Sequence, residues 1–203
     1  PRRVDIQGEI DLVEEIARLH GFDKFEASYL SKAVLSNMDS SVSDFKDKLG
    51  SILVSLGGLE SVTNSLIGTA DLLNLGWDEN DPRGNPVRIK NPLSMNESVL
   101  RTSLLPGLIK TASINQRNKT PGMFVWEMGR VFFSSQKAGE LPLEAGQIAM
   151  MSYGTLSHGN WAFGSENAGF FQLKGALAAL FDLLNVADVS YMPKAGMPFH
   201  PGR

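Results

Sequence analysis

The chain has 203 residues, of which 42% are hydrophobic and 20% are charged. This length and composition are typical of a globular protein with one or two domains and a core large enough to fold without disulfides or structural metals. The sequence has no cysteine, which excludes disulfides and thiolate metal sites and fits a reducing compartment such as the cytoplasm. Its formal net charge of −3 argues against a broad nucleic-acid surface. No apolar run approaches the roughly 18 residues of a membrane span, so we expect no membrane partner.

Residues 1–27 are predicted to form a short unit that ends in a helix, because apolar residues recur at helical spacing from Ile10 to Leu19. Four carboxylates lie on or just before this helix: Asp5, Asp11, Glu14 and Glu15. The last three are spaced i, i+3 and i+4, so they share one helix face. One interpretation is a solvated acidic first turn, which the helix dipole stabilises, and the spacing alone favours it. The other is a divalent cation bound through oxygen atoms.

Residues 28–41 are mixed and polar and are predicted to be a linker, and residues 42–56 are predicted to be an amphipathic helix. That helix carries an apolar stripe that we expect to belong to the core: Val42, Phe45, Leu49, Ile52, Leu53 and Leu56. Strands are expected at residues 60–67 and 87–89, with a loop rich in proline and glycine between them.

The central stretch, residues 91–133, begins with a turn and continues as a helix over residues 104–117, with Pro106 near its first turn. It ends in a nearly unbroken apolar run over residues 123–133, which is typical of a strand buried on both faces. Polar residues stand in this stretch at positions that the pattern does not demand: Asn91, Ser94, Asn96, Arg101, Asn115 and Arg117.

The last part of the chain is predicted to contain a hairpin connection over residues 134–145, a strand over 147–153, a helix over 171–184 and a strand over 186–191. Trp161, in a loop bounded by glycine, is expected to close the edge of the core. The order of elements lacks the regular strand–helix–strand repeat of a parallel sheet. We therefore predict an α+β fold, with an antiparallel sheet flanked by helices.

Common catalytic motifs are missing: the sequence has no phosphate-binding P-loop, no glycine-rich dinucleotide fingerprint and no nucleophile elbow. The histidines His20, His158 and His200 are far apart, and none has a partner nearby in the sequence. Glu127 and Arg130 interrupt the apolar strand. We interpret them as a pair satisfied by backbone or solvent at one strand end rather than as catalytic residues.

Five stretches of the sequence are informative when taken together, in this order and spacing: RRVDIQGEIDLVEEIARLHGFDKF, KNPLSMNESVLRTSLLPGLIKTASINQR, MFVWEMGRVFF, FQLKGALAALFDLL and FHPGR. Through them, nearly the whole chain resembles the beta subunits of bacterial phenylalanyl-tRNA synthetases. The resemblance implies that residues 1–27 are the C-terminal end of a preceding small domain and residues 28–41 a linker. Residues 42–203 would then be a module, truncated at its C-terminus, with the class II synthetase catalytic fold.

The resemblance also changes the interpretation of the four carboxylates. The family's magnesium site has an Asp, a second Asp six positions later, and paired Glu three and four positions after that, and it is completed by a ligand from the alpha subunit. Asp5, Asp11, Glu14 and Glu15 match this spacing at every position. The resemblance therefore implies that they bind Mg²⁺ shared with the alpha subunit.

The strand that ends at Phe133 resembles the ATP-binding motif of class II synthetases without its charged residues. These enzymes hold ATP with an Arg just after a strand and a carboxylate two positions on, in a form like GRVYRRD in the alpha subunit. Residues 129–132 match GRVY, but Phe133 and Ser135 stand where the Arg and the carboxylate should be. The resemblance thus implies a catalytic fold without a catalytic site.

We therefore expect a non-catalytic scaffold of the beta subunit. It would assemble with the catalytic alpha subunit in a cytoplasmic heterotetramer that attaches phenylalanine to tRNA(Phe). ATP would bind only in the alpha subunit, and tRNA(Phe) would bind through other parts of the beta subunit. The candidate subunit-interface residues are Asn91, Arg101, Pro106, Asn115 and Arg117. Two alternatives remain: an autonomous ATP-binding, adenylate-forming enzyme, and a nucleic-acid module that uses residues 115–119 and the Arg2–Arg3 end.

Overall fold

A computed structural model describes residues 5–28, 41–135, 139–162, 164–193 and 196–199, in two compact units of residues 1–40 and 41–203. The first unit contains helix α1 (Glu9–His20) and the 3₁₀ turn η1 (Phe22–Lys24), and no residue of α1 is buried. The Arg2–Arg3 end, most of the predicted linker and the FHPGR stretch from His200 onward lie outside the described residues. The predicted domain boundaries therefore stay predictions.

The second unit is built on a four-stranded sheet with the order β1 (Leu59–Glu60), β4 (Gly122–Phe133), β5 (Leu143–Ser157) and β6 (Glu166–Asn167). The long antiparallel hairpin of β4 and β5 forms its centre, and β6 adds antiparallel to β5. The edge strand β1 runs parallel to β4, so the sheet is not antiparallel throughout as predicted. The α+β class is confirmed.

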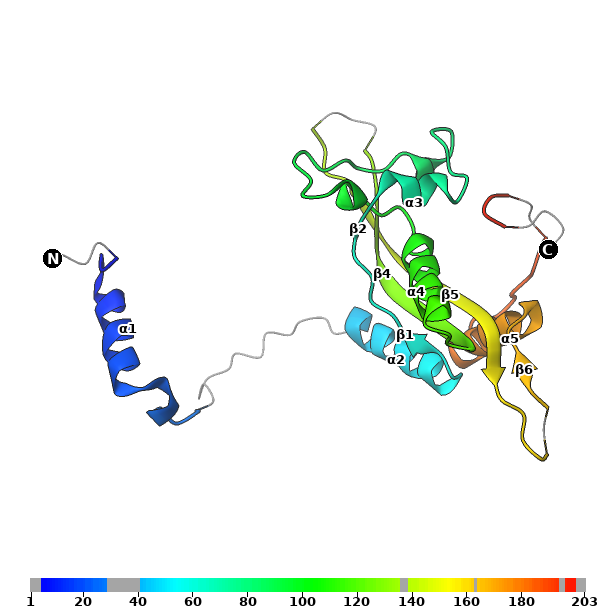
Figure 1. Cartoon of the computed structure of the whole chain (residues 1–203), viewed down its shortest axis with the longest axis horizontal. Helices are drawn as coiled ribbons and strands as arrows, with labels where there is room; N and C mark the ends of the chain where they lie inside the picture. The colour runs from blue at the N-terminus through cyan, green and yellow to red at the C-terminus, as the bar shows by residue number, and fades with distance from the viewer. Residues whose placement is uncertain (1–4, 29–40, 136–138, 163, 194–195, 200–203) are drawn as a thin grey trace. The chain divides into compact units, whose positions relative to one another are not determined.

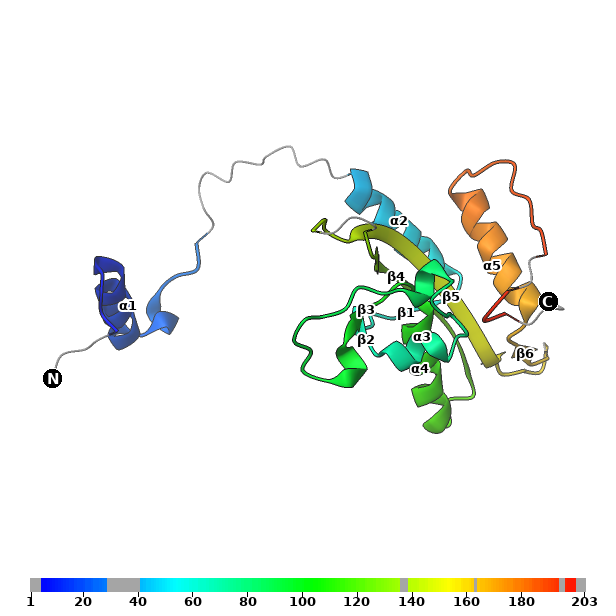
Figure 2. The same ribbon diagram turned by 90° about the horizontal axis from the view of Figure 1, so that it is seen from above.

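Helices cover both faces of the β4–β5 pair, as Figures 1 and 2 show. On one face Trp126 packs in a cluster with leucines of α2 (Ser41–Ser55) and α5 (Phe170–Leu183). On the other face lies α4 (Leu105–Arg117), with Leu108 fully buried. The apolar run of β4 is thus explained, because each of its faces meets a helix. No described helix has the length and apolar character that crossing a membrane requires.

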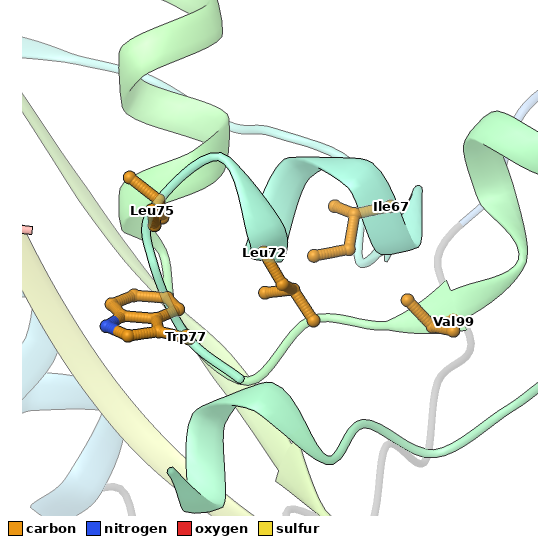
Figure 3. Close-up of a cluster of buried hydrophobic side chains, with 5 residues drawn as sticks. All are labelled: Ile67, Leu72, Leu75, Trp77 and Val99. Carbon is orange, nitrogen blue, oxygen red and sulfur yellow. The ribbon is translucent and has the colours of Figure 1, made fainter. Parts of the chain in front are cut away.

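A second, smaller core lies beside the sheet and is drawn in Figure 3. It joins β2 (Leu66–Ile67), β3 (Val99–Leu100), α3 (Thr69–Leu73) and Trp77, which is 1% exposed. The Trp77 Nε1 donates to the Met197 carbonyl at 3.3 Å, so a residue far along the chain closes this core. Two further 3₁₀ turns border it, η2 (Pro82–Gly84) and η3 (Met95–Glu97).

Several elements differ from the sequence-based predictions. The single strand expected over residues 60–67 is divided between β1 and β2, which belong to different sheets. Between them, Thr63 bonds to the side chains of Glu127 on β4 and of Arg101, which follows β3, instead of continuing one ladder. Residues 87–89 contribute only an isolated bridge between Arg88 and Val99. The strand expected over residues 186–191 is absent from this described segment.

Two predictions about core side chains are also wrong. Trp161 does not close the core edge but is 99% exposed. The stripe of α2 is only partly core, because Leu49 and Leu53 are buried whereas Val42 and Phe45 are more than half exposed. The sheet and α5 cover the second half of this helix and not its first turn.

Two helical glycines give a test of this packing. A Cβ at Gly107 of α4 would lie 2.2 Å from the Thr63 Oγ1, whereas one at Gly175 of α5 would meet nothing within 4 Å. We expect Gly175→Ala to raise the free energy of unfolding by about 0.5–1 kcal/mol, as helix propensity dictates. Gly107→Ala should instead lower it by about 1–3 kcal/mol through steric overlap. Urea unfolding measures both, and equal effects would contradict the packing of α4 on Thr63.

Candidate functional site

The first candidate site is the set of four carboxylate residues at helix α1, of which Asp11 lies in the first turn. The Asp11 Oδ2 accepts hydrogen bonds from the backbone N–H of Gln7 and of Gly8, each at 2.8 Å. These two bonds, that from Gln7 first, lower the pKa of Asp11 below its ordinary value, although the negative charge of Asp5 opposes the shift. Asp11 is therefore a carboxylate at neutral pH, the form that a metal ligand requires.

The side chains of Asp5, Glu14 and Glu15 are not gathered with Asp11 around one position that an ion could occupy. Glu15 accepts from the Arg18 Nη2 at 2.6 Å, and both Asp5 and Glu14 are exposed. Among the residues that the structure describes, no three His, Cys, Asp or Glu side chains are arranged to hold a metal ion. Helix α1 thus carries three of the four carboxylates on one element. Magnesium binding by the four residues stays a prediction.

The second candidate is an ion pair inside the module, between Arg101 and Glu127. Arg101 is 5% exposed and Glu127 is 1% exposed, and the Arg101 Nη1 lies 2.6 Å from the Glu127 Oε1. The Arg101 Nε donates to the Arg130 carbonyl at 2.9 Å. Arg101 follows β3 and Glu127 lies in the middle of β4, so the pair ties the start of the α4 segment to the sheet.

Thr63 completes this network from a third segment of the chain. Its backbone N–H and its hydroxyl donate to the two carboxylate oxygens of Glu127, at 3.2 and 2.8 Å. Its carbonyl accepts from the Arg101 Nη1 at 3.2 Å. Buried charges are stable only when their hydrogen-bonding capacity is satisfied, and Thr63 supplies that for both partners.

Glycine makes room for the network. A Cβ at Gly129 would lie 2.3 Å from the Arg101 Nη2, so a side chain at this position would displace the guanidinium from its hydrogen bonds. This is the glycine of the segment that resembles the ATP-binding motif of class II synthetases. Its small size here accommodates a side chain of the same protein, not a ligand.

The expectation that Glu127 and Arg130 form one pair is wrong. Successive side chains of a strand point to opposite faces, so residues three apart lie on opposite sides of the sheet. Glu127 faces Arg101, whereas Arg130 is exposed and forms an ion pair with Glu144 on β5. The sequence signal that could have found the first pair is the presence of two isolated charges in apolar surroundings, because buried charges need a partner.

The end of β4 offers no charged side chain at the two motif positions. Phe133 is the last residue of the strand and is half-buried. The Ser135 hydroxyl donates to the Glu140 Oε2 at 2.8 Å. Neither group can balance the charge of a phosphate.

The candidate interface residues divide into inward and outward groups. Arg101 and Pro106 are buried in the chain itself, and Asn115 is half-buried, with its Nδ2 donating to the Thr111 carbonyl at 2.9 Å. Asn91 and Arg117 are exposed. A contact between this stretch and another subunit would therefore be made by the exposed members, with Arg101 acting through the position of its segment. The sequence analysis did not identify Thr63 as a partner of the buried pair. A threonine in an irregular segment gives no sequence signal of such a role.

The fold is that of a class II aminoacyl-tRNA synthetase module. Two solved structures of the pyrrolysyl-tRNA synthetase of Desulfitobacterium hafniense resemble it, with TM-scores of 0.55 and 0.52 at 14% and 19% identity. They cover 77% and 73% of this chain and 49% and 48% of their own chains. At such low identity the likeness shows the fold alone.

The family is defined by the sequence comparisons. The model described as the phenylalanyl tRNA synthetase beta chain CLM domain matches residues 27–203. Phenylalanine–tRNA ligase beta subunits from Moorella thermoacetica and Bacillus cereus are 36% and 32% identical over 99% and 100% of the chain, and 25% of their own length. The chain belongs to the family of phenylalanine–tRNA ligase beta subunits and spans about a quarter of the length of these relatives.

The same substitution, Arg to Met, should lower the free energy of unfolding far more in the buried ion pair than in the exposed one. Arg101→Met should lower the free energy of unfolding by about 3–5 kcal/mol, because it leaves the Glu127 carboxylate buried without a countercharge. Arg130→Met removes one partner of the exposed pair and should cost at most about 1 kcal/mol. The double variant Arg101→Met, Glu127→Leu should cost less than the sum of its two single changes. Chemical denaturation measures these values, and strict additivity would contradict the coupling.

Proposed function

We propose that this chain is a non-catalytic scaffold of a phenylalanine–tRNA ligase beta subunit, which assembles with the catalytic alpha subunit in a cytoplasmic heterotetramer. The assembled enzyme would join phenylalanine to tRNA(Phe) with ATP bound in the alpha subunit. Other parts of the beta subunit would contact tRNA(Phe). The observation that carries the proposal is the side-chain pair Phe133 and Ser135, which replaces the Arg and the carboxylate of the ATP-binding motif.

The Arg101–Glu127 pair supports the same conclusion. Synthetases accelerate adenylate formation by positioning the α-phosphate and balancing its charge with fixed cations. Arg101 is a buried cation that bonds to the motif strand, and its charge is already balanced by Glu127. Arg130, on that strand, pairs with Glu144. Both arginines therefore already have partners within the chain.

The name beta subunit, which the relatives share, supports an alpha-subunit partner. The exposed residues Asn91 and Arg117 flank the buried part of the central stretch and are the contacts that we assign to this partner. Their neighbours Arg101 and Pro106 are held in place by the core. A surface presented on such a fixed stretch loses little conformational entropy on association.

We assign magnesium to Asp5, Asp11, Glu14 and Glu15, with a further ligand from the alpha subunit. The chemistry of the group fits Mg²⁺, which prefers oxygen ligands and retains several waters when few carboxylates bind it. The lowered pKa of Asp11 keeps this carboxylate charged, and α1 holds three of the four residues on one element. When bound, the ion would offset half of the negative charge of the four side chains and so reduce their mutual repulsion, and the chain alone would bind it weakly.

The non-catalytic role predicts that the chain does not bind ATP. Isothermal titration with ATP and Mg²⁺ should give no heat of binding, which places Kd above about 1 mM, because Phe133 and Ser135 stand at the two charged positions of the motif and cannot balance the α-phosphate. The alpha subunit measured under the same conditions is the positive control. A micromolar Kd for the chain would favour the alternative of an autonomous adenylate-forming enzyme.

The assembly predicts a magnesium-dependent complex with the alpha subunit. Size-exclusion chromatography of the mixture should show the complex, and EDTA should weaken it. Asp11→Asn should raise the Mg²⁺ concentration at half-assembly by about tenfold or more, since the three remaining carboxylates cannot replace the lost one. Glu9→Gln, on the same helix but outside the group, is the matched control and should change nothing. Failure of any complex to form, with or without Mg²⁺, would overturn the scaffold function.

A further inference from the structure

A hollow lies on the sheet face that α2 and α5 share. The two helices pack together through leucines such as Leu53 and Leu180, but the end of α2 and the first half of α5 leave a space of about 490 Å³ above the sheet. Its floor is the start of β4 and the end of β5. This volume is in the range of small-molecule sites, which is roughly 300–1,000 Å³.

The walls of this hollow are mostly apolar and unusually bare. Gly57 in the turn after α2, Gly122 on β4 and Gly175 on α5 line it, and a Cβ at Gly57 or Gly175 would meet nothing within 4 Å. Several leucines and a methionine are among the remaining lining residues, and one of them, Leu59, is 59% exposed. An apolar group that entered the hollow would remove this surface from water, which is the main driving force for binding in such a site.

The only charge among the described residues that line the hollow is negative. It belongs to Glu166 on β6, and the other polar lining residues are Ser152, Ser157 and Gln172. No lysine, arginine or histidine is among them. The one charged side chain of the lining therefore complements a cation and repels a carboxylate or a phosphate.

We infer that this hollow binds a small arylalkyl amine, with its apolar ring between α2 and α5 and its ammonium group beside Glu166. The site lies on the opposite face of the sheet from Arg101 and Glu127, so it does not depend on the scaffold function. The charge of the lining also separates this ligand from an amino acid. Phenylalanine carries the same ring and ammonium, but its carboxylate would stand near Glu166 without a cation.

The experiment is a protein-observed NMR titration of the 203-residue chain with three probes of equal apolar size: phenethylamine, 2-phenylethanol and phenylalanine. Phenethylamine should bind with Kd in the millimolar range, as expected for a ligand of few heavy atoms. It should bind about two- to fivefold more tightly than 2-phenylethanol, the value of a partly exposed ion pair, and more tightly than phenylalanine. Absence of shifts around the hollow up to about 20 mM phenethylamine would overturn the inference.

Two variants test separately the contribution of the apolar hollow and that of the Glu166 carboxylate. Gly175→Leu places a side chain of helix α5 in the hollow and should weaken the binding of all three probes at least about tenfold. Ala178→Leu, on an exposed position of the same helix, is the matched control and should bind as the parent does. Glu166→Gln should remove the preference for the amine and leave 2-phenylethanol unchanged. An unchanged affinity in Gly175→Leu, or a preference for the amine that survives Glu166→Gln, would contradict the assignment.

Discussion

The buried salt bridge between Arg101 and Glu127 is the constraint on which the architecture of the module depends. Transferring two charges from water to a protein interior costs several kcal/mol per ion, and only a complete set of hydrogen bonds offsets that cost. Here the set includes Thr63 and the Arg130 carbonyl, so four separate positions of the chain must be placed together. The glycine at position 129 is part of the same requirement, since any side chain there would occupy the space of the guanidinium.

This constraint separates the fold of the module from the chemistry that the fold is associated with. A sheet of this class can support a ligase only when charged side chains remain available to the nucleotide. In this chain the cation of the buried pair bonds within the core, and Phe133 and Ser135 stand at and just after the end of β4. In the scaffold function that we propose, the fold is retained while these charges contribute to its internal structure.

The two compact units of the chain differ in what they need from a partner. The module of residues 41–203 has two hydrophobic clusters and a satisfied buried ion pair. Helix α1 has no buried residue, and its carboxylates do not surround an ion without further ligands. The module thus contains its own buried core, whereas the metal site, as we propose it, is completed by another subunit.

The sequence by itself determined the elements whose signal is local. Periodicity located α2, α4 and α5, the apolar run located β4, and the order of elements gave the α+β class, because each depends on neighbouring residues. The tertiary structure decided the division of residues 60–67 between two sheets, the exposure of Trp161 and the partner of Glu127. These depend on contacts between segments far apart in the chain, such as Thr63 with Glu127, and no local pattern encodes which distant segment will supply a hydrogen bond.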